Sequence, residues 1–212
     1  MQGKAILPVM GGEDPDPARV LDFWFGNLDA NGQAAPEVAK RWWMKNPAFD
    51  REIREAFGQD HAAIVAGGRE TWLATPRGRL AYVIVLDQFS RNMFRDTADA
   101  FAHDAQALHA TLGGIERGDD HALAFDERTF LYMPLMHSED LGPQDRLVGL
   151  LTRWRDALAT DQRTRLEGTI EYARRHRAIV ARFGRFPHRN AVLGRTSTPE
   201  EIEFLKQPGS SF

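Results

Sequence analysis

Apolar side chains recur along most of this chain every three or four residues, which is the period of an amphipathic helix. The pattern is clearest in segments 48–66, 98–113 and 162–183. In the last of these, one face carries Leu166, Ile170, Ala173, Val180 and Phe183. Because His176 lies three residues after Ala173 and four before Val180, its side chain is expected to point inward.

Glycine and proline separate these segments and mark further helices. We predict the others at 14–25, from Pro36 to a break at 46–47, at 79–94, 127–139 with a kink at Pro134, 144–158 and 198–205, with a short helical turn at 190–193. Segment 79–94 is so rich in valine and isoleucine that a buried strand is an alternative, but its length favours a helix. The sequence therefore predicts an all-α fold of about ten helices packed in antiparallel pairs.

Composition agrees with an ordinary globular protein. The chain has 212 residues, 42% hydrophobic and 27% charged, so we expect a flexible leader at 1–13 and a single helical domain at 14–212. It has no cysteine, which excludes disulfides, thiolate catalysis and cysteine-based zinc sites. The longest apolar run, 80–86, is too short to cross a membrane, and the N-terminus does not resemble a signal peptide. We expect a cytoplasmic protein that does not contact membranes.

Positive charge is concentrated near the C-terminus, although the net charge of the chain is −3. Segment 172–199 contains no aspartate or glutamate and holds seven arginines: Arg174, Arg175, Arg177, Arg182, Arg185, Arg189 and Arg195. Apolar residues run through the segment, so it is expected to fold rather than to form a basic tail. Its charge must be balanced either by the protein's own carboxylates or by an anionic ligand.

The motif L-D-Q-F-S-R-N at 86–92 places charge on the most apolar helix. Asp87 and Arg91 are four residues apart and share a face, so they are expected to form an internal ion pair. Gln88 and Asn92 add hydrogen-bonding groups beside them. The alternative to a purely structural pair is that these four residues form the wall of a polar pocket.

A second motif, H-S-E at 137–139, ends an apolar segment. Consecutive helical residues point about 100° apart, so His137, Ser138 and Glu139 cannot converge as a catalytic triad. A metal site built on His137 and Glu139 lacks a diagnostic spacing, and we expect neither a metal nor a cofactor. The favoured interpretation is that Glu139 pairs with one of the C-terminal arginines.

A third cluster surrounds a predicted helix start near Pro187. Arg182, Arg185, His188, Arg189 and Asn190 lie within a few residues of it. Guanidinium groups and free backbone N–H groups at such a start can hold a carboxylate or a phosphate. The same arginines could instead pair with Asp87, Asp104 and Glu139, and nucleic-acid binding is a weaker alternative that the negative net charge disfavours.

Several of these motifs occur together in one known family. V-L-D-F-W-F-G, L-D-Q-F-S-R-N, H-S-E, R-F-G-R-F-P-H-R-N, L-G-R-T-S-T-P-E-E and F-L-K-Q-P-G-S-S-F appear here in that order. Over 20–212 the chain thus resembles the bacterial domain-of-unknown-function family 924, which is grouped with tetratricopeptide-like helical folds. The resemblance implies a helical, repeat-like fold and no established activity.

Two hypotheses follow for function. In the first, the C-terminal cluster, His176 and the residues of the two central motifs enclose a pocket for a small anionic ligand, with a hydrolytic reaction possible. In the second, the same residues are internal ion pairs, and an exposed helical groove binds a peptide or a second copy of the chain.

Overall fold

The computed structural model describes residues 14–211, and the leader predicted at 1–13 lies outside this range. The described chain is helical and contains no strand. Its α-helices are α1 (Ala18–Phe25), α2 (Pro36–Trp43), α3 (Pro47–Val65), α4 (Pro76–Ile84), α5 (Ser90–Met93), α6 (Asp104–Arg117), α7 (Phe125–His137), α8 (Leu141–Ala157), α9 (Thr160–Phe183) and α10 (Pro199–Leu205). The predicted all-α fold is therefore confirmed.

Short side chains and prolines fix several helix starts. Asn46 accepts the backbone N–H groups of Ala48 and Phe49 at the start of α3, and Thr75 accepts that of Gly78 in α4. Thr198 and Glu201 form a reciprocal capping box at α10. A glycine ends α9: Gly184, directly after its last residue, takes φ = +66°, which glycine adopts without strain.

The segment predicted as one helix at 79–94 has a finer structure. It begins earlier, at Pro76, and a five-residue π-helix (Val85–Phe89) separates α4 from α5. Inserted π-helical turns are rare and occur often at functional sites. All five π-helical residues are buried, including Asp87 and Gln88.

Three other boundaries differ from the prediction. Segment 98–113 starts with a 3₁₀ turn (Ala98–Ala100), and the helix itself is α6. Pro134 lies inside α7, as the prediction of an internal proline required. Pro143 occupies the first turn of α8, where its missing N–H is not needed, so 142–143 is a helix start and not a break. The expected turn at 190–193 is preceded by a 3₁₀ turn at Pro187–Arg189.

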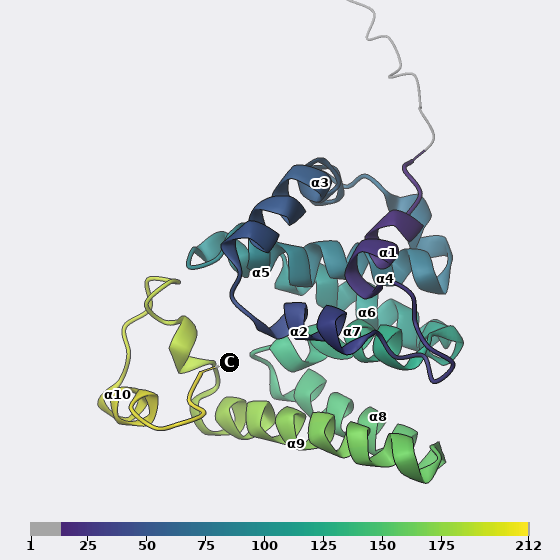
Figure 1. The fold of residues 1–212 in the computed structure, drawn as a ribbon. Helices are drawn as coiled ribbons and strands as arrows, with labels where there is room; N and C mark the ends of the chain where they lie inside the picture. The colour runs from purple at the N-terminus through teal and green to yellow at the C-terminus, as the bar shows by residue number, and fades with distance from the viewer. Residues whose placement is uncertain (1–13, 212) are drawn as a thin grey trace, which may run out of the picture.

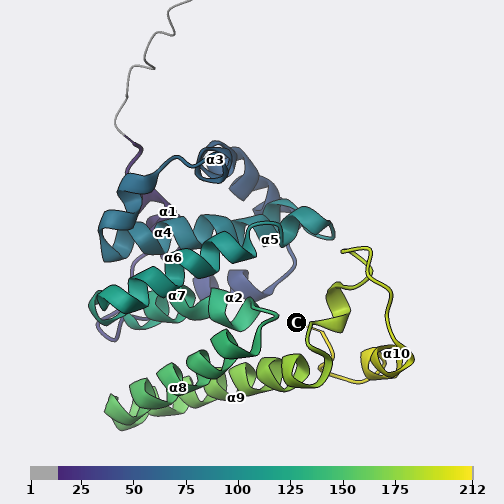
Figure 2. The ribbon, with the colours of Figure 1, turned by 180° about the vertical axis from the view of Figure 1, so that it is seen from behind.

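The helices pack in two parts, a larger body and a pair of helices that lies against it. Helices α1 to α7 form the larger body, while α8 and α9 lie side by side beneath it, joined at one end (Figure 1). The chain after α9 forms a separate lobe beyond the end of that helix, and the view from behind shows the same arrangement (Figure 2).

Two hydrophobic clusters lie in the fold, one shared by both helical parts and one where the end of α9 meets the C-terminal lobe. The larger spans α1 to α9 and includes the fully buried side chains of Trp24, Phe89, Phe130 and Leu131. The smaller consists of Ile179, Val180 and Phe186 with Phe183 and Phe204 packed against them. Within the described range, no helix is both long and apolar enough to cross a bilayer.

Candidate functional site

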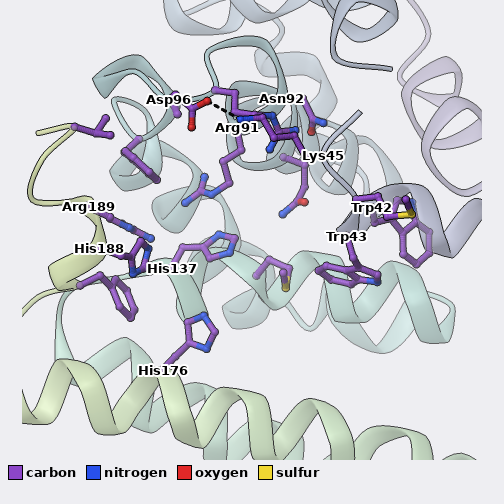
Figure 3. A pocket seen from close by; sticks show the side chains of 18 of the residues that line it. Trp42, Trp43, Lys45, Arg91, Asn92, Asp96, His137, His176, His188 and Arg189 are labelled. Carbon is purple, nitrogen blue, oxygen red and sulfur yellow. Dashed lines mark hydrogen bonds and ion pairs between the residues drawn. The ribbon is translucent and has the colours of Figure 1, made fainter. Parts of the chain in front are cut away.

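A cavity of about 450 Å³ lies where the C-terminal lobe meets the helical body. Its walls come from the end of α2, the π-helix and α5, the end of α7, α9 and the Pro187–Arg189 turn (Figure 3). The polar residues that line it are Lys45, Gln88, Arg91, Asn92, Arg95, Asp96, His137, Tyr172, His176, His188 and Arg189. The apolar residues are Trp42, Trp43, Met44, Ala100, Phe101, Met133, Phe186 and Val192.

The π-helix directs a buried carboxylate at a histidine of the cavity. Asp87 has no exposed surface, and its Oδ1 lies 2.7 Å from Nδ1 of His137. Burial alone would raise the pKa of Asp87, but Arg91 and His137 outweigh it and hold that pKa below its usual range. The ionised carboxylate can only accept, so Nδ1 of His137 carries the proton and Nε2 is the acceptor.

His137 is neutral at pH 7. Burial and the nearby Arg91 lower the pKa of its imidazole, and Asp87 offsets this only in part. The side chain is 13% exposed and lines the main cavity. A neutral imidazole whose Nδ1–H is held by a carboxylate can accept a hydrogen bond or a proton at Nε2.

Two arginines share one carboxylate beside this histidine. Arg91 forms a two-pronged pair with Asp104, with both N–O distances at 2.9 Å, and its Nη1 also lies 3.1 Å from Asp87. Arg189 reaches the same Asp104 through Nη1 at 3.2 Å. The pairing predicted for Asp87 and Arg91 is therefore present, and it is extended to the C-terminal lobe through Asp104.

Arg189 is held between aromatic rings. Its guanidinium carbon lies 4.6 Å from the ring centre of Phe101 and 4.7 Å from that of Phe186. Burial and the neighbouring Arg91 lower the pKa of Arg189 to about 10, so it remains charged at pH 7. Among the described residues, only Asp104 accepts a hydrogen bond from this side chain.

Two further histidines lie in the cavity wall. Burial lowers the pKa of His176 to about 3 and that of His188 to about 4, so both are neutral at pH 7. His176 points inward from α9, as its position on the apolar face predicts, and its Nδ1 lies 2.9 Å from the carbonyl oxygen of Tyr172. No three His, Asp or Glu side chains in the described range are grouped as metal ligands.

A second cavity of about 430 Å³ adjoins the first. Phe101, His137 and Arg189 line both, so these three side chains form the partition between them. Asp104, Ser138 and Glu139 line only the second cavity. Ser138 forms a local hydrogen bond, in which its Oγ accepts the backbone N–H of Asp140.

Glu139 binds the C-terminal lobe. It pairs with Arg195 through two contacts of 2.6 and 2.9 Å and accepts the backbone N–H of Phe186 at 2.7 Å. Burial alone would raise the pKa of Glu139, but Arg195 and the Phe186 N–H hold it lower. One of the C-terminal arginines thus pairs with Glu139, and that arginine is Arg195.

Three residues proposed for the pocket lie elsewhere. Arg182 pairs with Glu200, and Arg185 pairs with Glu201, both in the first turn of α10. Asn190 donates to Ser197 and Glu201. The structure does not bring these three side chains to the cavity, because the capped start of α10 supplies two carboxylates that neutralise Arg182 and Arg185.

The apolar end of the cavity was not predicted from sequence. Trp43 and Met44 are 61% and 51% exposed, and α2 has no buried residue. A signal was present, since consecutive tryptophans on a short helix cannot both face the core. The sequence could not show that this helix end faces Arg189, because the two lie far apart along the chain.

The profile of a bacterial protein family of unknown function, DUF924, matches residues 20–209. A solved structure, that of the protein of unknown function ATU0120 from Agrobacterium tumefaciens, is similar to this chain at 35% identity. The match covers 90% of this chain and 96% of the other, with a TM-score of 0.71. No curated protein matches the chain.

Proposed function

The chain belongs to the DUF924 family of bacterial proteins of unknown function, and we propose that it binds a small anionic ligand in the main cavity. The ligand's carboxylate or phosphate would lie beside Arg91 and Arg189, within reach of His137. A volume of about 450 Å³ is in the range that accommodates small molecules.

The observation that carries this proposal is the distribution of charge around the cavity. Among the described residues, four cationic side chains line it, those of Lys45, Arg91, Arg95 and Arg189, against a single carboxylate, Asp96. The carboxylates that pair with the arginines are outside this lining: Asp87 is fully buried, Asp104 faces the second cavity, and Asp50, the partner of Arg95, lies on α3.

These ion pairs hold the guanidinium groups in place and leave donors for a ligand. Arg189 uses only Nη1 within the described part of the chain, at the long distance of 3.2 Å. Arginine offers five N–H donors in a planar fork, which suits carboxylates and phosphates. Because these donors are already fixed in position, binding of an anion costs less side-chain entropy.

The test is a thermal-shift and calorimetric titration with sulfate and inorganic phosphate. Arg189→Gln is expected to lower the affinity at least about tenfold, since one charge-assisted contact contributes roughly 1.5–3 kcal/mol. Asp104 stays paired with Arg91 in this variant, so no carboxylate is left isolated. The matched control is Arg182→Gln, which removes the same charge near the end of α9, outside the cavity.

Equal anion binding by Arg189→Gln and the wild-type protein would contradict the proposal. If Arg189→Gln does not fold, Arg189→Lys keeps the charge but loses the planar fork and the stacking on Phe101 and Phe186. It is expected to bind sulfate more weakly than wild type. Sulfate that neither binds nor stabilises the wild-type protein would also exclude the anion site.

The Asp87–His137 pair supports hydrolysis as a second candidate function. A water molecule would give its proton to His137 Nε2, while its oxygen bonds to the acyl carbon or phosphorus of an ester and the bond to the leaving oxygen breaks. The leaving oxygen then takes the proton from Nε2. Release of p-nitrophenol from p-nitrophenyl acetate or phosphate should fall at least about a hundredfold in His137→Gln, as loss of a general base predicts. Rates no faster than in buffer would exclude hydrolysis of these esters.

The alternative is a non-catalytic scaffold that binds a peptide or a second copy of the chain. The pairing of Arg182, Arg185 and Arg195 with carboxylates of the protein supports this structural interpretation of the basic segment. The net positive lining of the cavity favours the small anion instead. A gel-filtration profile that depends on protein concentration would support self-association.

A further inference from the structure

We infer that the ligand is an organic anion with a flat apolar body, bound with its charged group between Arg91 and Arg189 and its body against Trp43. This inference rests on the proposed anion site and specifies the class of molecule that occupies it. The class comprises aryl or similarly flat carboxylates and phosphate monoesters, as opposed to inorganic anions.

The cavity has an arginine end and a tryptophan end. Figure 3 shows Arg189 and His188 at one end, Trp42 and Trp43 at the other, and His137 and Arg91 between them. An inorganic ion beside the guanidinium groups would leave the tryptophan end filled only by water. A ligand that covers both ends gains from charge pairing and from burial of apolar surface.

Trp43 is unusually exposed for its size. It has 61% of its surface exposed, the largest fraction among the large hydrophobic side chains of the described residues. Its neighbour Met44 is 51% exposed and lines the same cavity. Burial of tryptophan and methionine side chains away from water is favourable in free energy. Two such exposed residues at a cavity therefore indicate a surface that a ligand covers.

The Trp43 ring is already held in place by the core. It lies nearly parallel to the buried Phe130, at 17° and 6.0 Å between centres, and meets Trp42 edge-on at 6.3 Å. Trp42 is fixed in turn, since its Nε1 donates to the carbonyl oxygen of Trp24. A ring fixed before binding can stack on a ligand with little loss of side-chain entropy.

Charge near the tryptophan end is already balanced. Lys45 pairs with Asp96 at 2.8 Å, and Arg95 forms two contacts with Asp50 at 2.8 and 2.9 Å. Arg91 is likewise paired, with Asp104 and Asp87, so Arg189, which has one long contact to Asp104, is the donor best placed for an added anion. A ligand with one charged end is therefore favoured over one with an anionic group at each end.

The experiment compares ligands that share a charged group and differ by one ring. Isothermal titration calorimetry with inorganic phosphate and phenyl phosphate, and with acetate and phenylacetate, measures the contribution of the ring. In the wild-type protein, the ring is expected to lower Kd about tenfold in at least one pair, which equals about 1.4 kcal/mol. The pair that responds identifies the charged group as phosphate or carboxylate.

Variants of Trp43 test whether this side chain provides the tighter binding of ligands that carry a ring. Trp43→Ala is expected to abolish the advantage of the ring while leaving phosphate or acetate binding unchanged, and Trp43→Phe should retain most of it. Ile202→Ala, which shortens an exposed side chain of α10 away from the cavity, is the control and should match wild type.

The outcomes separate this inference from the anion site itself. Inorganic phosphate that binds in an Arg189-dependent way, without any gain from the ring, would overturn the inference and leave the anion site intact. Gain from the ring that persists in Trp43→Ala would also overturn it. Failure of all four compounds to bind would remove both proposals.

Discussion

At the scale of single residues, the most constrained group of the site is the carboxylate of Asp87. It is fully buried and has charged or hydrogen-bonding partners in Gln88, Arg91 and His137. A buried charge is tolerated only with such partners. The spacing of Asp87 and Arg91 was sufficient to predict their pair, whereas His137 lies fifty residues away and the contact depends on how α7 packs.

The histidine should make anion binding depend on pH. Because burial and Arg91 lower the pKa of His137, the imidazole is neutral in the empty site at pH 7. A bound anion would favour protonation and raise that pKa, so proton uptake accompanies binding. Sulfate, which keeps its charge over this range, should therefore bind more tightly as the pH falls from 8 to 5.5, as measured by calorimetry.

The control for this effect is His137→Gln, which keeps a hydrogen-bonding side chain but cannot titrate. Its affinity for sulfate should vary much less with pH than that of the wild-type protein. Sulfate affinity that stays constant in the wild-type protein over the same range would show that the anion lies away from His137.

At the scale of secondary structure, the helices follow from local pattern, while the features that build the site depend on long-range packing. Apolar periodicity predicted nearly every helix, including the last one, which Thr198 caps. The π-helix was not predicted. In a helix that is apolar on all sides, the sequence pattern is the same whether or not one turn contains an extra residue. That turn is nevertheless the element that carries Asp87 and Gln88.

The junction between α7 and the C-terminal lobe depends on Glu139. Glu139→Gln would weaken the contacts with Arg195, and its amide could accept the Phe186 N–H less strongly. We expect a loss of about 2 kcal/mol in the free energy of unfolding, because hydrogen bonds to charged groups each contribute roughly 1.5–3 kcal/mol. Urea unfolding followed by circular dichroism measures it.

Glu200→Gln provides a matched comparison for this junction. Glu200 pairs with Arg182 in the same lobe, but both side chains are about half exposed, so the change should stay within about 0.5 kcal/mol. If both variants lose the same stability, the lobe is not anchored through Glu139.

At the scale of the whole molecule, the cavity lies at the boundary between two hydrophobic clusters. Trp43 stacks on Phe130 of the larger core, and Arg189 stacks on Phe186 of the smaller. Composition and periodicity predicted the all-α class but not this boundary. The basic segment was expected to meet carboxylates of the middle of the chain, and Arg189 and Arg195 do, whereas Arg182 and Arg185 pair inside their own lobe.

The buried histidines predict how the stability of the whole protein responds to pH. Burial lowers the pKa of His61 and of His188 to about 4 and that of His176 to about 3, and it also lowers that of His137. In the unfolded chain, histidine titrates near about 6.5. Below that pH the unfolded state binds protons that the native state does not, so acid favours unfolding.

The free energy of unfolding should thus be highest above about pH 7 and fall between about pH 6.5 and 5, by on the order of 1–2 kcal/mol for each buried histidine. Carboxylates with lowered pKa values, such as Glu139, act in the same direction at lower pH, so this window isolates the histidines. His61→Phe removes one titrating group that does not line the cavity and should make the decline shallower by about one proton. Urea unfolding at pH 7.5, 6 and 5 measures the slope. Stability that stays unchanged across that range would show that these imidazoles are protonated in the folded protein. His137 would then also be protonated and could not accept a proton in the cavity.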